Sequence, residues 1–212
     1  MLREPAPVTG NRVLIVVDVQ NDFCAGGALA VPDGDAVVPV INRLARSFQN
    51  VVLTQDWHPA GHVSVASSHA GKTPFETVTL AYGTQVLWPD HCVQGTRGAA
   101  FHPGLDVPRA QTIVRKGYRA DVDSYSGFLE ADRTTPTGLR GTLAERGLTE
   151  AFVAGLATDF CVAWTALDAR RFGLDVTVIE DACRAIDAAG SLAKAWAAMA
   201  SAGVKRATST AL

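Results

Sequence analysis

Four side chains that could carry out chemistry follow apolar runs with the character of buried strands: Asp18, Asp56, Lys116 and Cys161. The apolar runs alternate with segments of helical periodicity, a pattern that predicts parallel strands joined by helices. Because the carboxyl ends of parallel strands lie along one edge of a sheet, we expect these four side chains to meet there. A carboxylate, an ammonium group and a thiol in one site are the components of nucleophilic catalysis by cysteine.

Cys161 is the predicted nucleophile. It lies where the fourth strand passes into a helix, and the N–H groups of a helix N-terminus lower the pKa of a thiol and can hold an oxyanion. Asp18 is the predicted general base and acid, while Lys116 would keep Asp18 ionised and favour the thiolate. The alternative is a small buried thiol, a carboxylate in an ion pair and a solvated lysine. We favour this structural alternative for the three cysteines that lack a strand-to-helix setting, Cys24, Cys92 and Cys183.

A second group of residues has the types of metal ligands. Asp56 and His58 are two residues apart, so in an extended segment their side chains point the same way. His91 lies in the same irregular region and is the candidate third ligand. A carboxylate with imidazoles suits a divalent transition metal such as Zn, Fe or Mn. Most Asp-x-His pairs bind no metal, but the concentration of histidines here, His62 included, favours a site; ordinary loop residues are expected at His69 and His102.

The strands that must position these residues are short and rich in branched apolar side chains. Continuous apolar runs are typical of strands buried on both faces, as in parallel sheets. We therefore predict an α/β fold with three layers, in which helices cover both faces of a mainly parallel six-stranded sheet. The predicted strands cover residues 13–17, 51–53, 112–115, 151–154, 176–179 and 204–207.

Helical periodicity predicts four helices between these strands. The first spans residues 37–48 with Asp35 as its N-cap, and the others cover residues 142–146, 159–172 and 191–202. Residues 57–109 break the alternation, with no convincing strand and little helical period. An irregular region of this length in a compact domain is usually functional.

Length and composition exclude several classes of protein. The 212 residues, 48% of them hydrophobic, predict one globular domain over residues 1–212 with an N-terminal extension at residues 1–11. A formal charge of −2 gives no electrostatic case for nucleic acid or an anionic membrane, and no apolar run approaches the roughly 20 residues of a membrane span. The extension lacks an apolar stretch, so we expect no signal peptide. The four cysteines form no C-x-x-C pair, and we expect reduced thiols in the cytoplasm.

Six short motifs follow one another along almost the whole chain. They are residues 18–23 (DVQNDF), 54–58 (TQDWH), 88–92 (WPDHC), 116–117 (KG), 125–128 (YSGF) and 155–162 (GLATDFCV). Together they resemble the nicotinamidases of the isochorismatase-like cysteine hydrolases. The positions of Asp18, Lys116 and Cys161 are shared by the wider superfamily, whereas the D-x-H and W-P-x-H-C motifs are more specific to the nicotinamidases.

The resemblance implies catalytic and metal-binding roles. Cys161 would be the nucleophile, and Asp18 and Lys116 would complete its triad. His62 matches a position that binds the metal in some members, and we expect it to support a ligand instead. One divalent transition metal would be bound by Asp56, His58 and His91.

The resemblance also implies an oxyanion hole and an aromatic pocket. A cis peptide bond between Leu156 and Ala157 would aim the N–H groups of Ala157 and Cys161 at the oxyanion. Phe23 and Trp88 would enclose a pyridine ring, with two further aromatic side chains nearby, Tyr125 and Phe160.

The implied activity is metal-dependent hydrolysis of nicotinamide to nicotinate and ammonia through a cysteine thioester, with pyrazinamide as a second substrate and NAD salvage as the pathway. Three alternatives stay open: a hydrolase of the same fold acting on another amide or a carbamoyl group, a binding module that has lost catalysis, and a vinyl ether hydrolase that does not use the cysteine. The oligomeric state stays open too, a homo-oligomer included.

Overall fold

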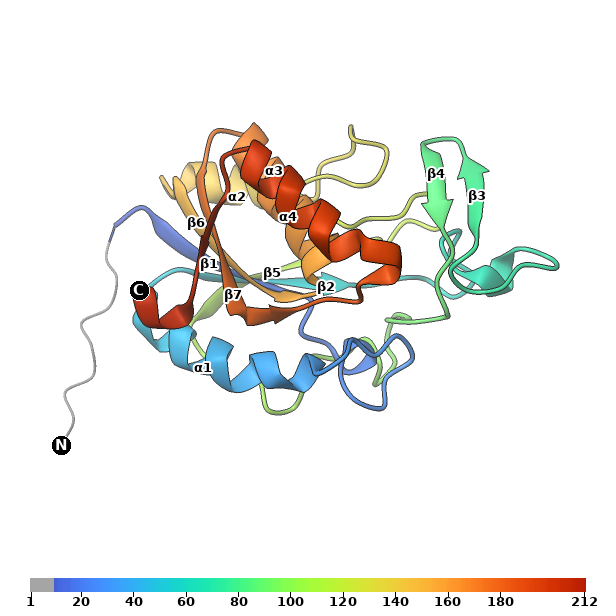
Figure 1. Cartoon of the computed structure of the whole chain (residues 1–212), viewed down its shortest axis with the longest axis horizontal. Helices are drawn as coiled ribbons and strands as arrows, with labels where there is room; N and C mark the ends of the chain where they lie inside the picture. Colours follow the sequence, from blue (N-terminus) through green and yellow to red (C-terminus); the bar gives the residue numbers. More distant parts are fainter. Residues whose placement is uncertain (1–9) are drawn as a thin grey trace.

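In the computed structural model, which describes residues 10–212, six strands form one parallel sheet in the order β5-β2-β1-β6-β7-β8 (Figure 1). The predicted six-stranded parallel sheet is thereby confirmed. Four neighbouring strands of this sheet, β5, β2, β1 and β6, each end at or beside one of the residues of chemical interest. The strands are β1 (Arg12–Val17), β2 (Val51–Asp56), β5 (Ala110–Lys116), β6 (Glu150–Leu156), β7 (Asp175–Arg184) and β8 (Lys205–Ala207).

Helices cover both faces of the sheet, as predicted for three layers (Figure 1). Among the described helices, α1 (Val37–Ser47) packs on one face, and three others pack on the opposite face. Adjacent residues of a buried strand point to opposite faces of the sheet. The same apolar runs therefore contribute side chains to the cores on both faces. The three helices on the second face are α2 (Leu139–Glu145), α3 (Ala163–Arg171) and α4 (Ser191–Ser201).

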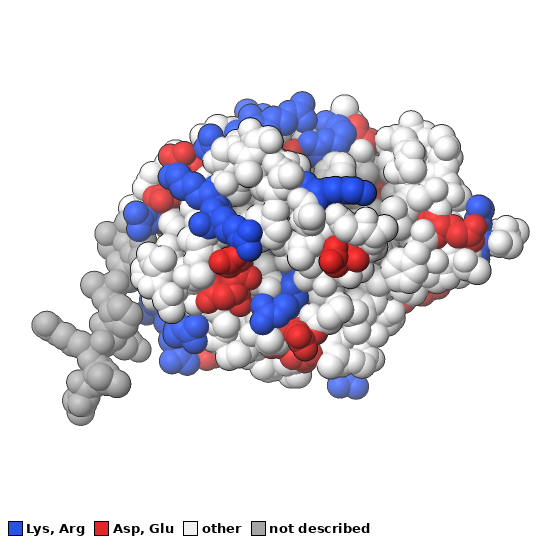
Figure 2. Space-filling model, viewed as in Figure 1, with Lys and Arg blue, Asp and Glu red and all other residues white. Residues whose placement is uncertain are grey.

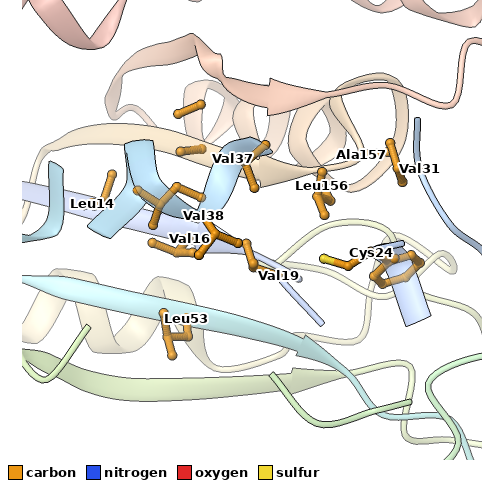
Figure 3. Close-up of a cluster of buried hydrophobic side chains, with 14 of the residues drawn as sticks. Leu14, Val16, Val19, Cys24, Val31, Val37, Val38, Leu53, Leu156 and Ala157 are labelled. Carbon is orange, nitrogen blue, oxygen red and sulfur yellow. The ribbon is translucent and has the colours of Figure 1, made fainter. Parts of the chain in front are cut away.

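Figure 3 shows the core between α1 and the sheet. Leu14 and Val16 of β1, Leu53 of β2 and Val37 and Val38 of α1 belong to one cluster of buried side chains. Burial of each large aliphatic side chain contributes about 1.5–3 kcal/mol. This packing holds β1 and β2 firmly, and with them the loops that leave their carboxyl ends.

One local prediction about the helices is wrong, and another is right in extent but not in the type of its first turn. Asp35 does not cap α1, whose N-cap is Ala36; the Asp35 carboxylate instead accepts hydrogen bonds from the Ala25 N–H and from His102. The helix expected from residue 159 begins as a π-helical turn over Thr158–Val162, and α3 starts only at Ala163. Cys161 therefore lies inside the π turn, two residues before the start of α3.

The irregular region contains a hairpin that we did not predict. β3 (Thr77–Leu80) and β4 (Gly83–Val86) pair in antiparallel fashion and extend beyond the main sheet, at the right of Figure 1. Most of their side chains are exposed or half-buried. The expectation of no strand here was wrong. β3 (TVTL) does alternate polar and apolar residues, but over four residues only, and β4 (GTQV) has a single apolar residue, so the pattern is too short to distinguish a strand from a loop.

The surface carries both signs of charge. Figure 2 shows basic and acidic side chains on the same face, with uncharged surface between them, and pairs such as Arg170 with Asp175 (3.1 Å) join the two signs. Within residues 10–212, no helix is long and apolar enough to cross a membrane. Of the predicted N-terminal extension, residues 1–11, residues 1–9 lie outside the described part of the chain.

Candidate active site

The four strand-end residues meet at one edge of the sheet, as predicted. Lys116 is fully buried, and its Nζ is 2.9 Å from Oδ2 of Asp18 and 3.4 Å from Sγ of Cys161. The same ammonium forms a close ion pair with Asp56. The topology explains this meeting, because β5, β2, β1 and β6 are four neighbouring strands.

The charges of this cluster are strongly coupled. Burial alone would lower the pKa of Lys116, but the carboxylates of Asp18 and Asp56 outweigh it and raise that pKa well above its usual value. Burial raises the pKa of Asp18, and the charge of Lys116 does not fully offset it. One ammonium group thus faces two carboxyl groups. Lys116 therefore acts on Asp18 in the predicted direction, by favouring its ionised form, but burial outweighs this effect.

The pKa of Cys161 also differs from the prediction. Burial raises it well above the usual value, although the charge of Lys116 acts in the opposite direction. The expected lowering assumed a thiol exposed at a helix N-terminus, whereas Cys161 is only 6% exposed and lies in a π turn ahead of α3. The raised pKa favours the protonated thiol of Cys161 over the thiolate.

Thr54 is a component of this cluster that the sequence analysis missed. Its Oγ1 donates a 2.6 Å hydrogen bond to Oδ1 of Asp18 and accepts one from the Asp18 N–H at 3.2 Å. Thr54 is fully buried and lies two residues before Asp56 on β2, so both side chains lie on one face of the strand. A hydroxyl directly after the apolar run of residues 51–53 was the available signal.

The three predicted metal ligands lie together beside this cluster. Oδ2 of Asp56 is 3.8 Å from Nε2 of His58 and 3.9 Å from Nε2 of His91. Such spacing fits donors that each lie about 2 Å from a shared ion. Burial lowers the pKa of both histidines to about 4, so both rings are neutral, as metal ligation requires.

The far side of each imidazole is anchored. Nδ1 of His58 is 2.9 Å from the carbonyl oxygen of Gly117, and Nδ1 of His91 is 2.8 Å from that of Pro89. A carbonyl only accepts hydrogen bonds, so each Nδ1 carries the proton and each Nε2 keeps its lone pair. These residues therefore fit a divalent transition metal.

His62 has a different environment. Its ring stacks on that of His58 at 4.3 Å, while Nδ1 is 2.7 Å from Ser64 Oγ and Nε2 is 3.1 Å from the Val122 carbonyl oxygen. Both nitrogens have hydrogen-bond partners, which fits a residue that supports His58 rather than one that binds the ion.

A pocket with about 340 Å³ of space, open solvent at its mouth included, joins the two clusters. Cys161 lies on its wall together with Asp56, His58 and His91. The Trp88 ring is nearly perpendicular to Phe160 at 4.9 Å between centroids. The cis peptide between Leu156 and Ala157 is present as expected, and Ala157 lines the pocket. All four predicted aromatic side chains line it too: Phe23, Trp88, Tyr125 and Phe160.

Known proteins share this arrangement of the chain. A family model described as Isochorismatase domain matches residues 12–211. A nicotinamidase of Acinetobacter baylyi is 58% identical over 199 residues, which are 94% of this chain and 93% of that protein. A solved structure of an Acinetobacter baumanii nicotinamidase/pyrazinamidase has a TM-score of 0.95 and 59% identity, covering 96% of this chain and 99% of that one.

A more distant solved structure contains a metal. The pyrazinamidase of Pyrococcus horikoshii, solved in complex with zinc, has a TM-score of 0.77 and 35% identity, covering 94% of this chain and 99% of that one. Its sheet and helices match this fold, and the family resemblance carried by the six motifs is confirmed. The chain belongs to the isochorismatase domain family.

Proposed function

We propose that this chain is a metal-dependent cysteine amidohydrolase that converts nicotinamide to nicotinate and ammonia, and that also deamidates pyrazinamide. One observation carries the proposal: the Lys116 cluster with Cys161 and the imidazole cluster open into the same aromatic pocket. A planar ring amide suits a pocket with a nucleophile at one side and aromatic walls. The names of the relatives at high identity support this substrate.

Proton transfer from Cys161 to Asp18 would start the reaction. The raised pKa of Asp18 makes it a stronger base than an ordinary aspartate, and Lys116 lies within reach of both groups. The ammonium of Lys116 stabilises the thiolate as it forms.

Thiolate attack on the carboxamide carbon would give a tetrahedral oxyanion. We assign the N–H groups of Ala157 and Cys161 to hold that oxygen. Asp18 then returns its proton to the amide nitrogen, ammonia leaves, and a nicotinoyl thioester remains on Cys161. Asp18 next takes a proton from water, whose attack releases nicotinate and regenerates the thiol.

Asp56, His58 and His91 would hold one divalent transition metal. When bound there, the metal supplies a Lewis acid for a ring nitrogen of the substrate. Asp56 also contacts Lys116, so this one carboxylate belongs to both clusters. Phe23 and Trp88 are assigned to the faces of the ring, with Tyr125 and Phe160 beside them.

Ammonia release from nicotinamide tests the proposal. We expect turnover of nicotinamide and pyrazinamide, loss of turnover after chelation, and recovery with Zn, Fe or Mn. Cys161→Ala should lower kcat by about 10³-fold or more, because the nucleophile acts as a unit with its base. Cys183→Ala is the matched control, since Cys183 is also buried but does not line the pocket.

Benzamide separates this proposal from a general aromatic amidase. It lacks the ring nitrogen, so we expect it to be a poor substrate in the same assay. Turnover of benzamide at the rate of nicotinamide would reject recognition through the ring nitrogen. Turnover by Cys161→Ala close to that of the wild type would reject the covalent mechanism.

A further inference from the structure

Gln85 is a buried polar residue on a hairpin that is otherwise largely exposed. It lies in β4 and is 1% exposed, whereas its strand neighbours Gly83 and Thr84 are exposed. Figure 1 shows this hairpin outside the main sheet. A buried amide is costly unless it forms hydrogen bonds, so the partners of Gln85 show what it holds.

Two hydrogen-bond partners of the Gln85 side chain belong to the pocket wall. Its Nε2 donates to Oδ2 of Asp123 at 2.7 Å and to the hydroxyl oxygen of Tyr125 at 3.1 Å. It also contacts the carbonyl oxygen of Val86 at 2.6 Å. Its Oε1 accepts a 2.9 Å hydrogen bond from the Tyr82 hydroxyl, which fixes the orientation of the amide. Asp123 and Tyr125 both line the pocket.

The Tyr125 hydroxyl connects Gln85 to a second aromatic wall. Trp88 Nε1 donates to the same oxygen at 3.1 Å, so Tyr125 receives one hydrogen bond from the hairpin and one from the WPDHC segment. A hydroxyl oxygen has two lone pairs, and these two donors occupy both. Gln85 and Trp88 therefore fix where the Tyr125 ring lies.

We propose that Gln85 is a positioning residue that holds Tyr125 at the wall of the pocket, and so sets how well the pocket accepts a planar heteroaromatic amide. The inference rests on the proposed function for its substrate. Gln85 does not line the pocket and acts through the hydrogen bond to the Tyr125 hydroxyl. No hydrogen bond joins Gln85 to Asp18, Lys116 or Cys161 among the described contacts, so it should affect binding of the ring more than the chemical step.

Gln85→Met tests this role, because methionine has similar length but no donor. We expect KM for nicotinamide to rise about tenfold with kcat within about threefold, the pattern of lost uniform binding. Gln85→Glu should raise KM further, because it adds a carboxyl group beside Asp123. Thr84→Ala, on the exposed side of the same strand, is the control for hairpin stability and should leave both constants unchanged.

A double-mutant cycle identifies the path of the effect. If Gln85 acts largely through the Tyr125 hydroxyl, Gln85→Met in a Tyr125→Phe background should add little to the KM of Tyr125→Phe alone. Losses that multiply, or a Gln85→Met variant with a reduced kcat and an unchanged KM, would overturn the proposal.

Near-ultraviolet circular dichroism of the ligand-free protein keeps this test separate from the proposed function. Gln85→Met should reduce the aromatic signal while the far-ultraviolet spectrum stays unchanged, and the reduction should disappear in the Tyr125→Phe background. A wild type without nicotinamide turnover would reject the proposed function alone. An unaltered aromatic spectrum in Gln85→Met would reject the positioning role whatever the substrate.

Discussion

Two clusters in the molecule contain similar side chains but differ in the groups that anchor their histidines. Each offers three possible ligand atoms within 4.8 Å of one another, and each includes a carboxylate and an imidazole. The first lies in the pocket and the second in a separate surface hollow. The first consists of Asp56, His58 and His91, and the second of Cys24, Asp35 and His102.

The ring proton lies on Nε2 in His102 and on Nδ1 in His58. The Gly104 N–H donates to Nδ1 of His102 at 3.1 Å, so that nitrogen carries a lone pair. Nε2 must then bear the proton of the neutral ring, and it donates to Oδ1 of Asp35 at 3.1 Å. In His58 the carbonyl of Gly117 faces Nδ1 and leaves Nε2 free.

The second cluster is therefore a structural clasp. Oδ2 of Asp35 accepts the Ala25 N–H at 2.8 Å, so the clasp ties the loop after Phe23 to the segment before α1. Burial also raises the pKa of the Cys24 thiol to about 11, which disfavours the thiolate that a metal needs. Residue types alone do not make a metal site; the backbone group opposite Nδ1 decides which nitrogen is free.

Removing one histidine from each cluster should give the largest difference. His91→Ala should lose bound metal and lower kcat/KM by about 100-fold or more. His102→Ala should keep the metal, because its Nε2 is already used as a donor to Asp35. Metal content by mass spectrometry and ammonia release measure both effects. Equal loss of metal from the two variants would contradict the distinction between them.

The two anchoring glycines provide a second, smaller contrast. Gly117 has a φ of +62°, and a Cβ there would lie 2.5 Å from Cε1 of His58. Gly117→Ala should therefore displace the His58 ring and weaken metal binding by about 10–100-fold. A Cβ on Gly104 would lie 3.2 Å from the His102 ring, and Gly104→Ala should leave metal binding unchanged. Competition with a chelator measures both metal affinities. Similar affinities for the two variants would contradict the claim that the contact with Gly117 positions the His58 ring for metal binding.

The strand-end residues were predictable because they depend on topology. Asp18, Lys116 and Cys161 each follow a strand whose apolar run is visible in the sequence, and the handedness of parallel connections brings the ends together. The dual contact of Asp56 was not predictable, because it depends on which of its two oxygens faces Lys116 and which faces the imidazoles.

The failures have local physical causes. In the hairpin that carries Gln85, the alternation of polar and apolar residues is confined to the four residues of β3, which is too short to distinguish a strand from a loop. The pKa of Cys161 was predicted from its place before a helix, but its direction is set by burial, which sequence position does not reveal. His102 was interpreted as an ordinary loop residue; the contact with Asp35 joins residues 67 apart in sequence, and no spacing rule indicates it.

The smallest expected effect is that of Asp35→Asn on stability. The Ala25 N–H is the main cause that holds the pKa of Asp35 below its usual value of 3.8, with His102 acting in the same direction. A carboxylate whose pKa is lowered by folding stabilises the folded state above pH 3.8, and this stabilisation is lost as pH falls through the lower folded value. Because Asp35 is partly exposed, the loss in Asp35→Asn at pH 7 should be below about 1 kcal/mol. Urea unfolding at pH 7 and near pH 3 should show the wild-type advantage shrinking with acid, while metal content stays that of the wild type; an advantage that grows with acid would show that the Asp35 carboxylate is not stabilised in its ionised form.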